Sequence, residues 1–128
     1  MRILAIDHGD ARAGTAICDP SGTIVRSLGV VSPPDAAAVA RVASEKEAEL
    51  IVVGLPVSLD GSEGAQAAVA RAFASEIESH AGVPVETYDE RLTTRMAAQT
   101  ARGGATAPAD ALAAAHLLES YLAARGSG

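Results

Sequence analysis

Carboxylates stand at three separated places in this sequence where they could do chemistry. Asp7 ends an otherwise apolar segment, Asp89-Glu90 follows a second β-prone segment, and Asp110 opens the last helical pattern. A carboxylate at the end of a buried strand is poorly hydrated unless a cation meets it. If the three places converge, divalent cations relieve the mutual repulsion, and two ions about 3.5 to 4 Å apart support in-line attack on a phosphodiester. Oxygen-only ligands favour Mg²⁺ or Mn²⁺ over zinc.

Each of these acidic residues also has a local role open to it. Asp7 could accept a backbone hydrogen bond in the turn that follows its strand. Asp89 could cap the helix expected to follow it, with Glu90 as a first-turn charge. Asp110 could serve the last helix in the same way. The spacing leaves both interpretations open, so convergence of the three carboxylates is a prediction that a structure tests.

Other residues near these positions could contact a phosphate backbone. The segment 54–64 is a glycine-bounded loop that opens a helix, but it lacks the Gly-Lys-Ser/Thr ending of a P-loop, so an ordinary strand-to-helix connection is favoured. Arg91, Thr94 and Arg95 lie beside the second acidic pair, where solvated helix faces explain them equally well. His8 could carry a proton, whereas a lone histidine more commonly packs or lies at the surface.

Length and composition describe one ordinary domain. The 128 residues are 48% apolar and 20% charged, with a formal net charge of −6, and a chain of this size can bury a core without disulfides. Cys18 is the only cysteine, which excludes an intramolecular disulfide and a cysteine-based zinc site and favours a reducing cytoplasm. No apolar run approaches the ~20 residues of a membrane span, so we expect neither export nor membrane insertion. The acidic balance argues against a broad basic surface for nucleic acid, although several arginines, Arg12 among them, fall near the acidic positions.

Hydrophobic patterning predicts the elements that would position these residues. Three β-prone segments separated by short turns predict an antiparallel meander over residues 2–7, 13–19 and 23–31. The segment 32–35, which ends in Asp35, offers the start of a helix that runs to about Lys46. The later elements are expected in the order central strand at 50–53, helix from Ala65 until Gly82, edge strand at 83–88, short helix at 91–101 and last helix from Pro108. The right-handed crossover rule then yields an α/β fold with a mixed five-stranded sheet flanked by helices.

Two further expectations concern packing and domain limits. Helical spacing predicts that one face of the helix after the glycine-bounded loop is buried, through Ala65, Ala68, Val69, Ala72, Phe73, Ile77 and His80. We expect a single domain over residues 1–125 and a disordered tail at 126–128.

Four motifs, in this order along the chain, resemble the YqgF family. They are Ile6-Asp7-His8-Gly9 with Arg12 and Gly14, then Gly54-Leu55-Pro56 with 60–64, then Asp89-Glu90-Arg91-Leu92-Thr93-Thr94, and then Asp110-Ala111-Leu112-Ala113-Ala114 with 117–122. Members of this family are described as pre-16S rRNA nucleases or Holliday junction resolvase-like proteins. The resemblance spans nearly the whole chain. It implies a ribonuclease H-like fold, a divalent-metal nuclease site, a bacterial cytoplasmic setting and a role in trimming the 5′ end of the small-subunit rRNA precursor.

Carried over by position, the resemblance implies that Asp7, Glu90 and Asp110 are the catalytic carboxylates and the ligands of Mg²⁺ or Mn²⁺, with Asp89 as the alternative to Glu90. It implies substrate contacts at Arg12, Gly54, Pro56, Arg91 and Thr94. The implied partner is structured RNA, as in precursor 16S rRNA or a pre-ribosomal particle, or branched DNA, bound by a monomer or weak homodimer.

Two departures from related patterns bear on how substrate is held. The segment 102–109 lacks the lysines that often precede the last aspartate in the family. True junction resolvases of the same fold carry an acidic residue at the end of the fourth strand, where this chain has Gly54-Leu55-Pro56.

Three functions therefore remain open. The first is a metal-dependent endonuclease or exonuclease acting on structured RNA. The second is a resolvase of four-way DNA junctions, which needs a symmetric dimer to cut two strands. The third is an rRNA-binding assembly factor that cleaves nothing, favoured by the acidic balance and the single lysine. An ATPase of the actin and sugar-kinase type shares the Asp-x-Gly pattern of the first strand, but its nucleotide lies between two such domains and this chain has one.

Overall fold

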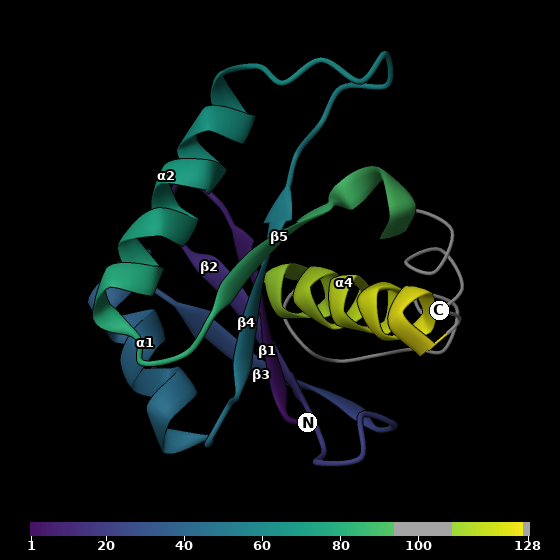
Figure 1. Cartoon of the computed structure of the whole chain (residues 1–128). Coiled ribbons are helices and arrows are strands. Elements are labelled where there is room, and N and C mark those ends of the chain that lie inside the picture. Colours follow the sequence, from purple (N-terminus) through teal and green to yellow (C-terminus); the bar gives the residue numbers. More distant parts are fainter. Residues whose placement is uncertain (94–108, 127–128) are drawn as a thin grey trace.

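Five strands form one mixed sheet in the order β3-β2-β1-β4-β5, with helices on both faces (Figure 1). This is a computed structural model, and it describes residues 1–93 and 109–126. The strands are β1 (Ile3–His8), β2 (Ala13–Cys18), β3 (Val25–Val31), β4 (Leu50–Leu55) and β5 (Val85–Asp89). The helices are α1 (Ala36–Glu45), α2 (Ala65–His80), the 3₁₀ turn η1 (Glu90–Thr93) and α4 (Ala109–Gly126). The element order and the mixed sheet agree with the prediction.

The antiparallel half of the sheet is the predicted meander. β1 pairs with β2 and β2 with β3, both antiparallel. β3 begins two residues later than expected because the Asp19 side chain accepts hydrogen bonds from the backbone N–H groups of Thr23 (2.8 Å) and Ile24 (2.9 Å). These two residues therefore belong to the turn before β3.

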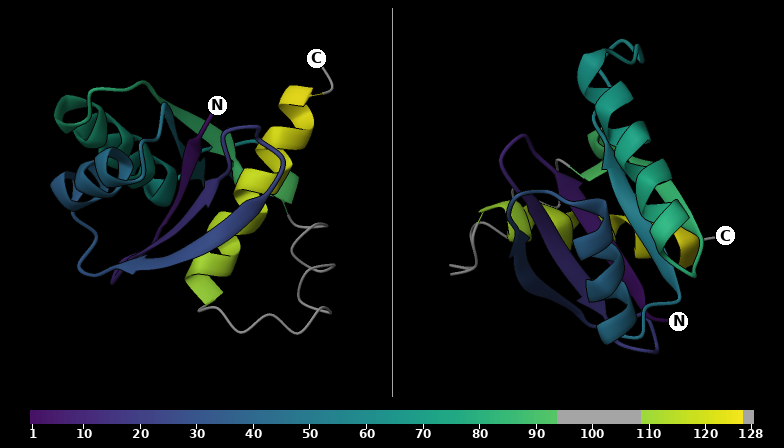
Figure 2. Two further views of the ribbon diagram at one scale, coloured as in Figure 1. Left: turned by 90° about the horizontal axis from the view of Figure 1, so that it is seen from below. Right: turned by 90° about the vertical axis from the view of Figure 1, so that its left-hand side faces the viewer.

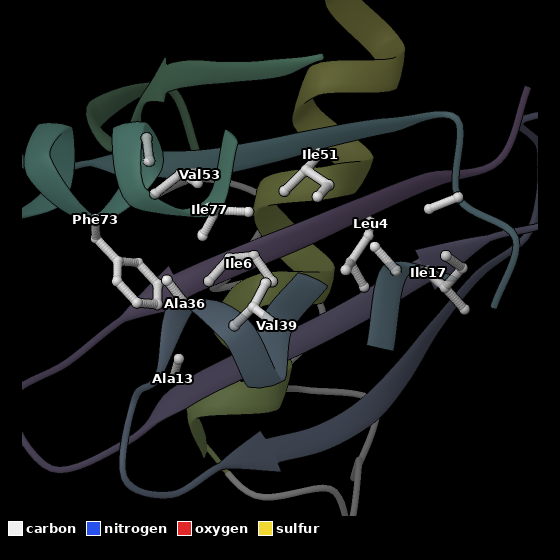
Figure 3. Packing of buried hydrophobic residues seen from close by; sticks show 13 residues of the cluster. Leu4, Ile6, Ala13, Ile17, Ala36, Val39, Ile51, Val53, Phe73 and Ile77 are labelled. Atoms are coloured by element: carbon white, nitrogen blue, oxygen red, sulfur yellow. The ribbon is translucent and has the colours of Figure 1, made fainter. Parts of the chain in front are cut away.

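The central strands are apolar on both sides because helices cover both faces of the sheet. Leu4 and Ile6 of β1 pack toward α1 and α2, as Figure 3 shows, whereas Ile3 and Ala5 pack toward α4. β4 alternates in the same way, with Ile51 and Val53 on the first face and Leu50 and Val52 on the second. Both β4 pairings are parallel, with β1 on one side and β5 on the other.

Helices α1 and α2 lie on one face of the sheet and α4 crosses the other, an arrangement visible in both views of Figure 2. α1 begins where expected, since the Asp35 carboxylate accepts a hydrogen bond from the Ala38 backbone N–H (3.2 Å). α4 turns alanines such as Ala111 and Ala114 toward the sheet, and both are fully buried. These small side chains let α4 approach the sheet closely.

The buried face of α2 differs from the prediction. Phe73 and Ile77 are buried, but Val69 is 44% exposed, and the other predicted inward positions, Ala65, Ala68, Ala72 and His80, are exposed. The inward alanines are instead Ala67, Ala70 and Ala74. A helix with alanine on every side has weak apolar periodicity, so the position of the β4–α2–β5 crossover decides which alanines meet the sheet.

The predicted short helix begins as the 3₁₀ turn η1 at Glu90, and residues 94–101 of that prediction lie outside the described residues. Pro84 is tolerated directly before β5 because proline has no N–H to donate and β5 is an edge strand. The Pro84 carbonyl oxygen still accepts a hydrogen bond from the Ile51 N–H (3.0 Å). α4 includes Gly126, and residues 127–128 of the predicted tail are likewise not described. None of the described helices combines the length and the apolar character needed to cross a bilayer.

Candidate active site

Asp7 and Glu90 meet at one edge of the sheet. β1, β4 and β5 run parallel, so their carboxyl ends lie together, and the paired residues there include Ile6 with Val53 and Leu55 with Asp89. Asp7 is the second-to-last residue of β1, and Glu90 directly follows β5. The Glu90 carboxyl group forms a side-chain hydrogen bond with Asp7. Two of the three predicted carboxylates are therefore in contact.

The surroundings of the Glu90 carboxyl group favour its protonated form. Burial raises its pKa, and the hydrogen bond with Asp7, the charge of Asp7 and the charge of Asp89 add to the effect, bringing the pKa to about 8. Two carboxyl groups in contact cannot both ionise without a nearby cation. At neutral pH the pair therefore retains a proton that a cation could replace.

Gly54 provides the space that Glu90 occupies. It lies within β4, so its backbone is extended, and a Cβ atom added there would lie 2.9 Å from Glu90 Oε1 and 3.1 Å from Cδ. Any side chain at this position would displace the Glu90 carboxyl group. The missing side chain of Gly54 therefore permits this close approach of Glu90.

Asp89 stabilises the turn after β5, whereas its neighbour Glu90 contacts Asp7. Asp89 Oδ1 accepts a hydrogen bond from the Arg91 backbone N–H (2.9 Å), which caps η1. The Arg91 guanidinium also donates hydrogen bonds to this carboxylate, with Nε 2.9 Å and Nη2 2.6 Å from Oδ2. These hydrogen bonds hold the pKa of Asp89 below its usual range. The local capping role foreseen for Asp89 is confirmed.

Arg91 also reaches the loop between β4 and α2. Its Nη1 donates to the carbonyl oxygens of Ser58 (3.3 Å) and Leu59 (3.4 Å). The guanidinium thus links the turn that carries Glu90 to a loop more than thirty residues earlier in the chain. The guanidinium already donates to Asp89, Ser58 and Leu59, so phosphate binding by Arg91 would have to compete with these contacts.

A chain of hydroxyl groups ties α4 to the same turn. Tyr88 of β5 places its hydroxyl 2.9 Å from Ser120 Oγ, and Ser120 Oγ donates to the Leu92 carbonyl oxygen (3.2 Å). Ser120 is buried. Ser120 and Tyr88 are not among the residues predicted for the site, although a serine within the apolar pattern of the last helix is a signal of a buried polar contact.

The structure describes the backbone of Asp110 but not its side chain, and it does not describe Thr94. Asp110 lies in the first turn of α4, and the next residue, Ala111, accepts a hydrogen bond from Ser27 Oγ of β3 (3.3 Å). The Asp110 side chain and all of Thr94 lie outside the described residues. Within the described part of the chain, no three His, Cys, Asp or Glu residues gather closely enough to hold a metal ion.

The other predicted residues border this edge. Arg12 is exposed in the turn between β1 and β2, where its carbonyl oxygen accepts from the Gly9 N–H (2.9 Å). Pro56 directly follows β4 and is half-buried. The centroids of the His8 and Phe73 rings lie 4.4 Å apart. His8 therefore packs against α2, which agrees with the packing role that is common for a lone histidine.

Comparisons with known proteins agree with this arrangement. Residues 1–124 match the family described as "RuvX: Holliday junction resolvase". A relative from Anaeromyxobacter sp. (strain Fw109-5), named "Putative pre-16S rRNA nuclease", is 48% identical over 98 residues, covering 73% of this chain and 72% of the relative. A relative of the same name from Syntrophus aciditrophicus (strain SB) is 37% identical over 132 residues, covering 95% and 88%.

The fold is also shared with a solved structure. Thermus thermophilus RuvC superposes with a TM-score of 0.69 at 21% identity, over 99% of this chain and 97% of that chain. The ribonuclease H-like fold expected from the four motifs is therefore confirmed.

Proposed function

We propose, because this chain belongs to the RuvX family, that it is a metal-dependent nuclease that hydrolyses phosphodiester bonds in the 5′-end maturation of precursor 16S rRNA. The observation that carries this proposal is the contact between the Asp7 and Glu90 carboxyl groups at the carboxyl edge of the parallel strands. Open α/β sheets bind their ligands at this edge. The names of the relatives supply the substrate class.

The carboxyl pair has the chemistry of a divalent-cation site. Both donors are oxygens, and the raised pKa of Glu90 means that the pair holds a proton where a cation would be favoured. We assign Asp7 and Glu90 as ligands of Mg²⁺ or Mn²⁺, with Asp110 at the start of α4 as the third ligand. A bound divalent ion would supply positive charge for the attacked phosphate and favour ionisation of a water nucleophile.

The protein groups have distinct parts in this proposal. Asp7 and Glu90 hold carboxylate oxygens at one point, and Gly54 leaves the room that Glu90 needs. Arg91 holds Asp89 in the turn, and Glu90 is the residue that faces Asp7. Arg12, exposed at the same edge, is the cation we assign to the substrate's phosphates, and the resemblance to the family implies further substrate contacts at Gly54, Pro56 and Thr94.

The direct test is cleavage of a precursor small-subunit rRNA fragment that carries its 5′ leader. We expect cleavage in Mg²⁺ or Mn²⁺ and none in EDTA, with Asp7→Asn and Glu90→Gln both inactive and folded. Asp10→Asn, which removes an exposed carboxylate from the turn after β1, is the matched control and should stay active. Full activity of Asp7→Asn would exclude this function.

A second candidate is resolution of four-way DNA junctions, because the matched family is described as a Holliday junction resolvase. Paired cuts across a junction require a symmetric dimer. The same variants on junction DNA, combined with the solution mass, discriminate the two substrates, since a strictly monomeric protein that cuts only RNA excludes resolution. RNA binding that survives Asp7→Asn without any cleavage would instead identify an assembly factor.

A further inference from the structure

A small cavity lies at the end of the sheet opposite the carboxyl pair, beside the turn between β2 and β3, at the lower end of the sheet in Figure 1. Its volume is about 150 Å³. The residues that line it are Arg2, Ile17, Cys18, Asp19, Ile24 and Arg26. Arg2 precedes Asp7 by five residues, so at about 3.3 Å per strand residue the two lie about 17 Å apart. The cavity is therefore separate from the candidate active site.

Strand register brings two arginines to this cavity from different strands. Ile17 of β2 pairs with Leu4 of β1 and with Arg26 of β3, so these three side chains lie on the same face of the sheet. Arg2 stands two residues before Leu4 and continues the alternation on that face. The meander therefore brings two guanidinium groups, far apart in the sequence, to one cavity.

The Arg2 guanidinium has no counter-charge among the described residues. Protein atoms enclose its Nε, and this nitrogen has no hydrogen-bond partner within residues 1–93 and 109–126. Over the same ranges, neither Arg2 nor Arg26 forms an ion pair with a carboxylate. Glu49 is exposed nearby, but its Oε2 accepts from the Arg2 backbone N–H (3.0 Å). A partly buried cation without a partner costs free energy, which an anion in the cavity would offset.

Asp19, the acidic residue that lines the cavity, is held in the turn by other donors. Its Oδ1 accepts from the Thr23 and Ile24 N–H groups, and its Oδ2 accepts from the Ser21 hydroxyl (2.6 Å). These hydrogen bonds lower the pKa of Asp19 to about 2, so it is ionised at neutral pH. Its single negative charge opposes two arginines, and the lining residues together keep an excess of positive charge.

The size and the walls of the cavity select a phosphate group. Pockets that enclose a whole drug-sized ligand measure roughly 300 to 1,000 Å³, so a cavity of about 150 Å³ admits only a small group. Each planar guanidinium presents a fork of N–H donors that matches phosphate oxygens. Four tetrahedral oxygens can meet two guanidinium groups that approach from different strands. Ile17 and Cys18 are buried beside them, and an apolar wall strengthens the attraction between opposite charges.

We propose that this cavity binds one phosphate group between Arg2 and Arg26. The chemistry is the same for free inorganic phosphate and for a phosphate in the backbone of a bound RNA, which would lie about 17 Å from the carboxyl pair. The inference goes beyond the proposed function and does not depend on cleavage. It gives an acidic chain, with a formal net charge of −6, a local site for an anion.

The first arm of the test titrates inorganic phosphate into the protein in EDTA and follows the NMR signal of the Arg2 Nε–H. Protein atoms shield this group from water, so its proton exchanges slowly, and Arg2→Lys assigns the signal by removing it. Phosphate should shift the signal saturably, and sodium chloride at equal ionic strength should not. Arg26→Gln, a change at an exposed residue, should weaken phosphate binding about tenfold, as expected for losing a hydrogen bond between charged groups.

The second arm measures binding of an rRNA leader hairpin in EDTA at several salt concentrations. If RNA supplies the phosphate, Arg26→Gln should weaken binding about tenfold. It should also reduce the slope of log affinity against log salt concentration by about 0.7 to 0.9, the value for one phosphate contact. Arg41→Gln is the matched control, because it removes the same charge from an exposed position on α1. It should leave the affinity and the slope unchanged.

The two arms distinguish the sources of the phosphate. A response to inorganic phosphate with unchanged RNA affinity in Arg26→Gln identifies free phosphate, and a loss of RNA affinity in that variant identifies the RNA backbone. No response in either arm overturns the inference, as does an equal change in Arg41→Gln. Because both arms are read in EDTA, a protein that binds phosphate here but never cleaves RNA refutes the nuclease function alone, and an active nuclease without either response refutes this inference alone.

Discussion

The Tyr88 hydroxyl lies 2.9 Å from Ser120 Oγ, which in turn donates to the Leu92 carbonyl oxygen. This partly buried contact joins β5, α4 and η1, the elements that carry or adjoin Glu90 and Asp110. Buried hydroxyl groups with satisfied partners fix relative positions more sharply than apolar packing does. The Ser120 contact therefore sets how the start of η1 sits against α4.

Ser120→Ala should lower kcat and raise the Mg²⁺ concentration for half-maximal activity, with KM for RNA unchanged. The reason is that η1 loses its link to α4 while the substrate-facing residues stay. Loss of the two hydrogen bonds should reduce the free energy of unfolding by about 1 to 2 kcal/mol. Steady-state kinetics at several Mg²⁺ concentrations, with thermal unfolding, measure both effects.

Tyr121→Phe supplies the control for that variant. The Tyr121 hydroxyl also joins α4 to β5, through Glu86 Oε1 (2.9 Å), but it has no contact with η1 among the described residues. It should cost similar stability and leave the Mg²⁺ requirement as in wild type. Parallel losses of activity in both variants would mean that general stability, and not the position of η1, is responsible.

Gly54→Ala should reduce activity at least tenfold while the protein stays folded. The new Cβ atom would lie 2.9 Å from Glu90 Oε1, so the carboxyl group must move away from Asp7. Nuclease assays and circular dichroism measure the two outcomes. Gly82→Ala, where an added Cβ meets nothing within 4 Å, should behave as wild type, and an active Gly54→Ala would show that the close approach is dispensable.

The metal-free protein should lose stability as the pH rises from about 5 to about 8. The pKa of Glu90 is raised from 4.5 to about 8 in the folded state, so folding favours the protonated form. That contribution is complete below the unfolded pKa and is lost as the pH climbs through the folded pKa. Chemical denaturation in EDTA at several pH values measures this slope.

Glu90→Gln should flatten the slope over the same pH range, because the amide does not titrate. Adding Mg²⁺ to wild type at pH 8 should restore stability, since the cation replaces the proton of the pair. A wild-type slope equal to that of Glu90→Gln would contradict the carboxyl contact as the source of the pH dependence.

Arg91→Lys should loosen the loop over residues 56–64. Lysine keeps the charge but lacks the planar fork that reaches Asp89 and two loop carbonyl oxygens together. Amide hydrogen exchange at Gly61, whose N–H donates to the Ser58 carbonyl oxygen, should become faster. Arg71→Lys is the comparison, and it should affect the exchange of Glu63 and its neighbours more than that of Gly61.

Much of the fold follows from local pattern. The continuous apolar character of β1 and β4 predicts strands buried on both faces, and the Asp35 cap and the edge position of β5 after Pro84 follow from single residue types. The inward face of α2 did not follow, because its alanines offer no contrast between faces and the crossover decides which of them pack.

The residue types and the order of the motifs determined by themselves that carboxylates lie near the carboxyl ends of β1 and β5, because local hydrophobic patterning reports where strands stop. Only the tertiary structure decided which of Asp89 and Glu90 contacts Asp7, since both occupy the same place in the pattern. Arg91 draws Asp89 into the turn, and the missing side chain of Gly54 admits Glu90 to Asp7. The contacts of Glu90 with Gly54 and Asp7 join residues more than thirty positions apart, and their geometry depends on strand register and on the space between strands, which no local periodicity carries.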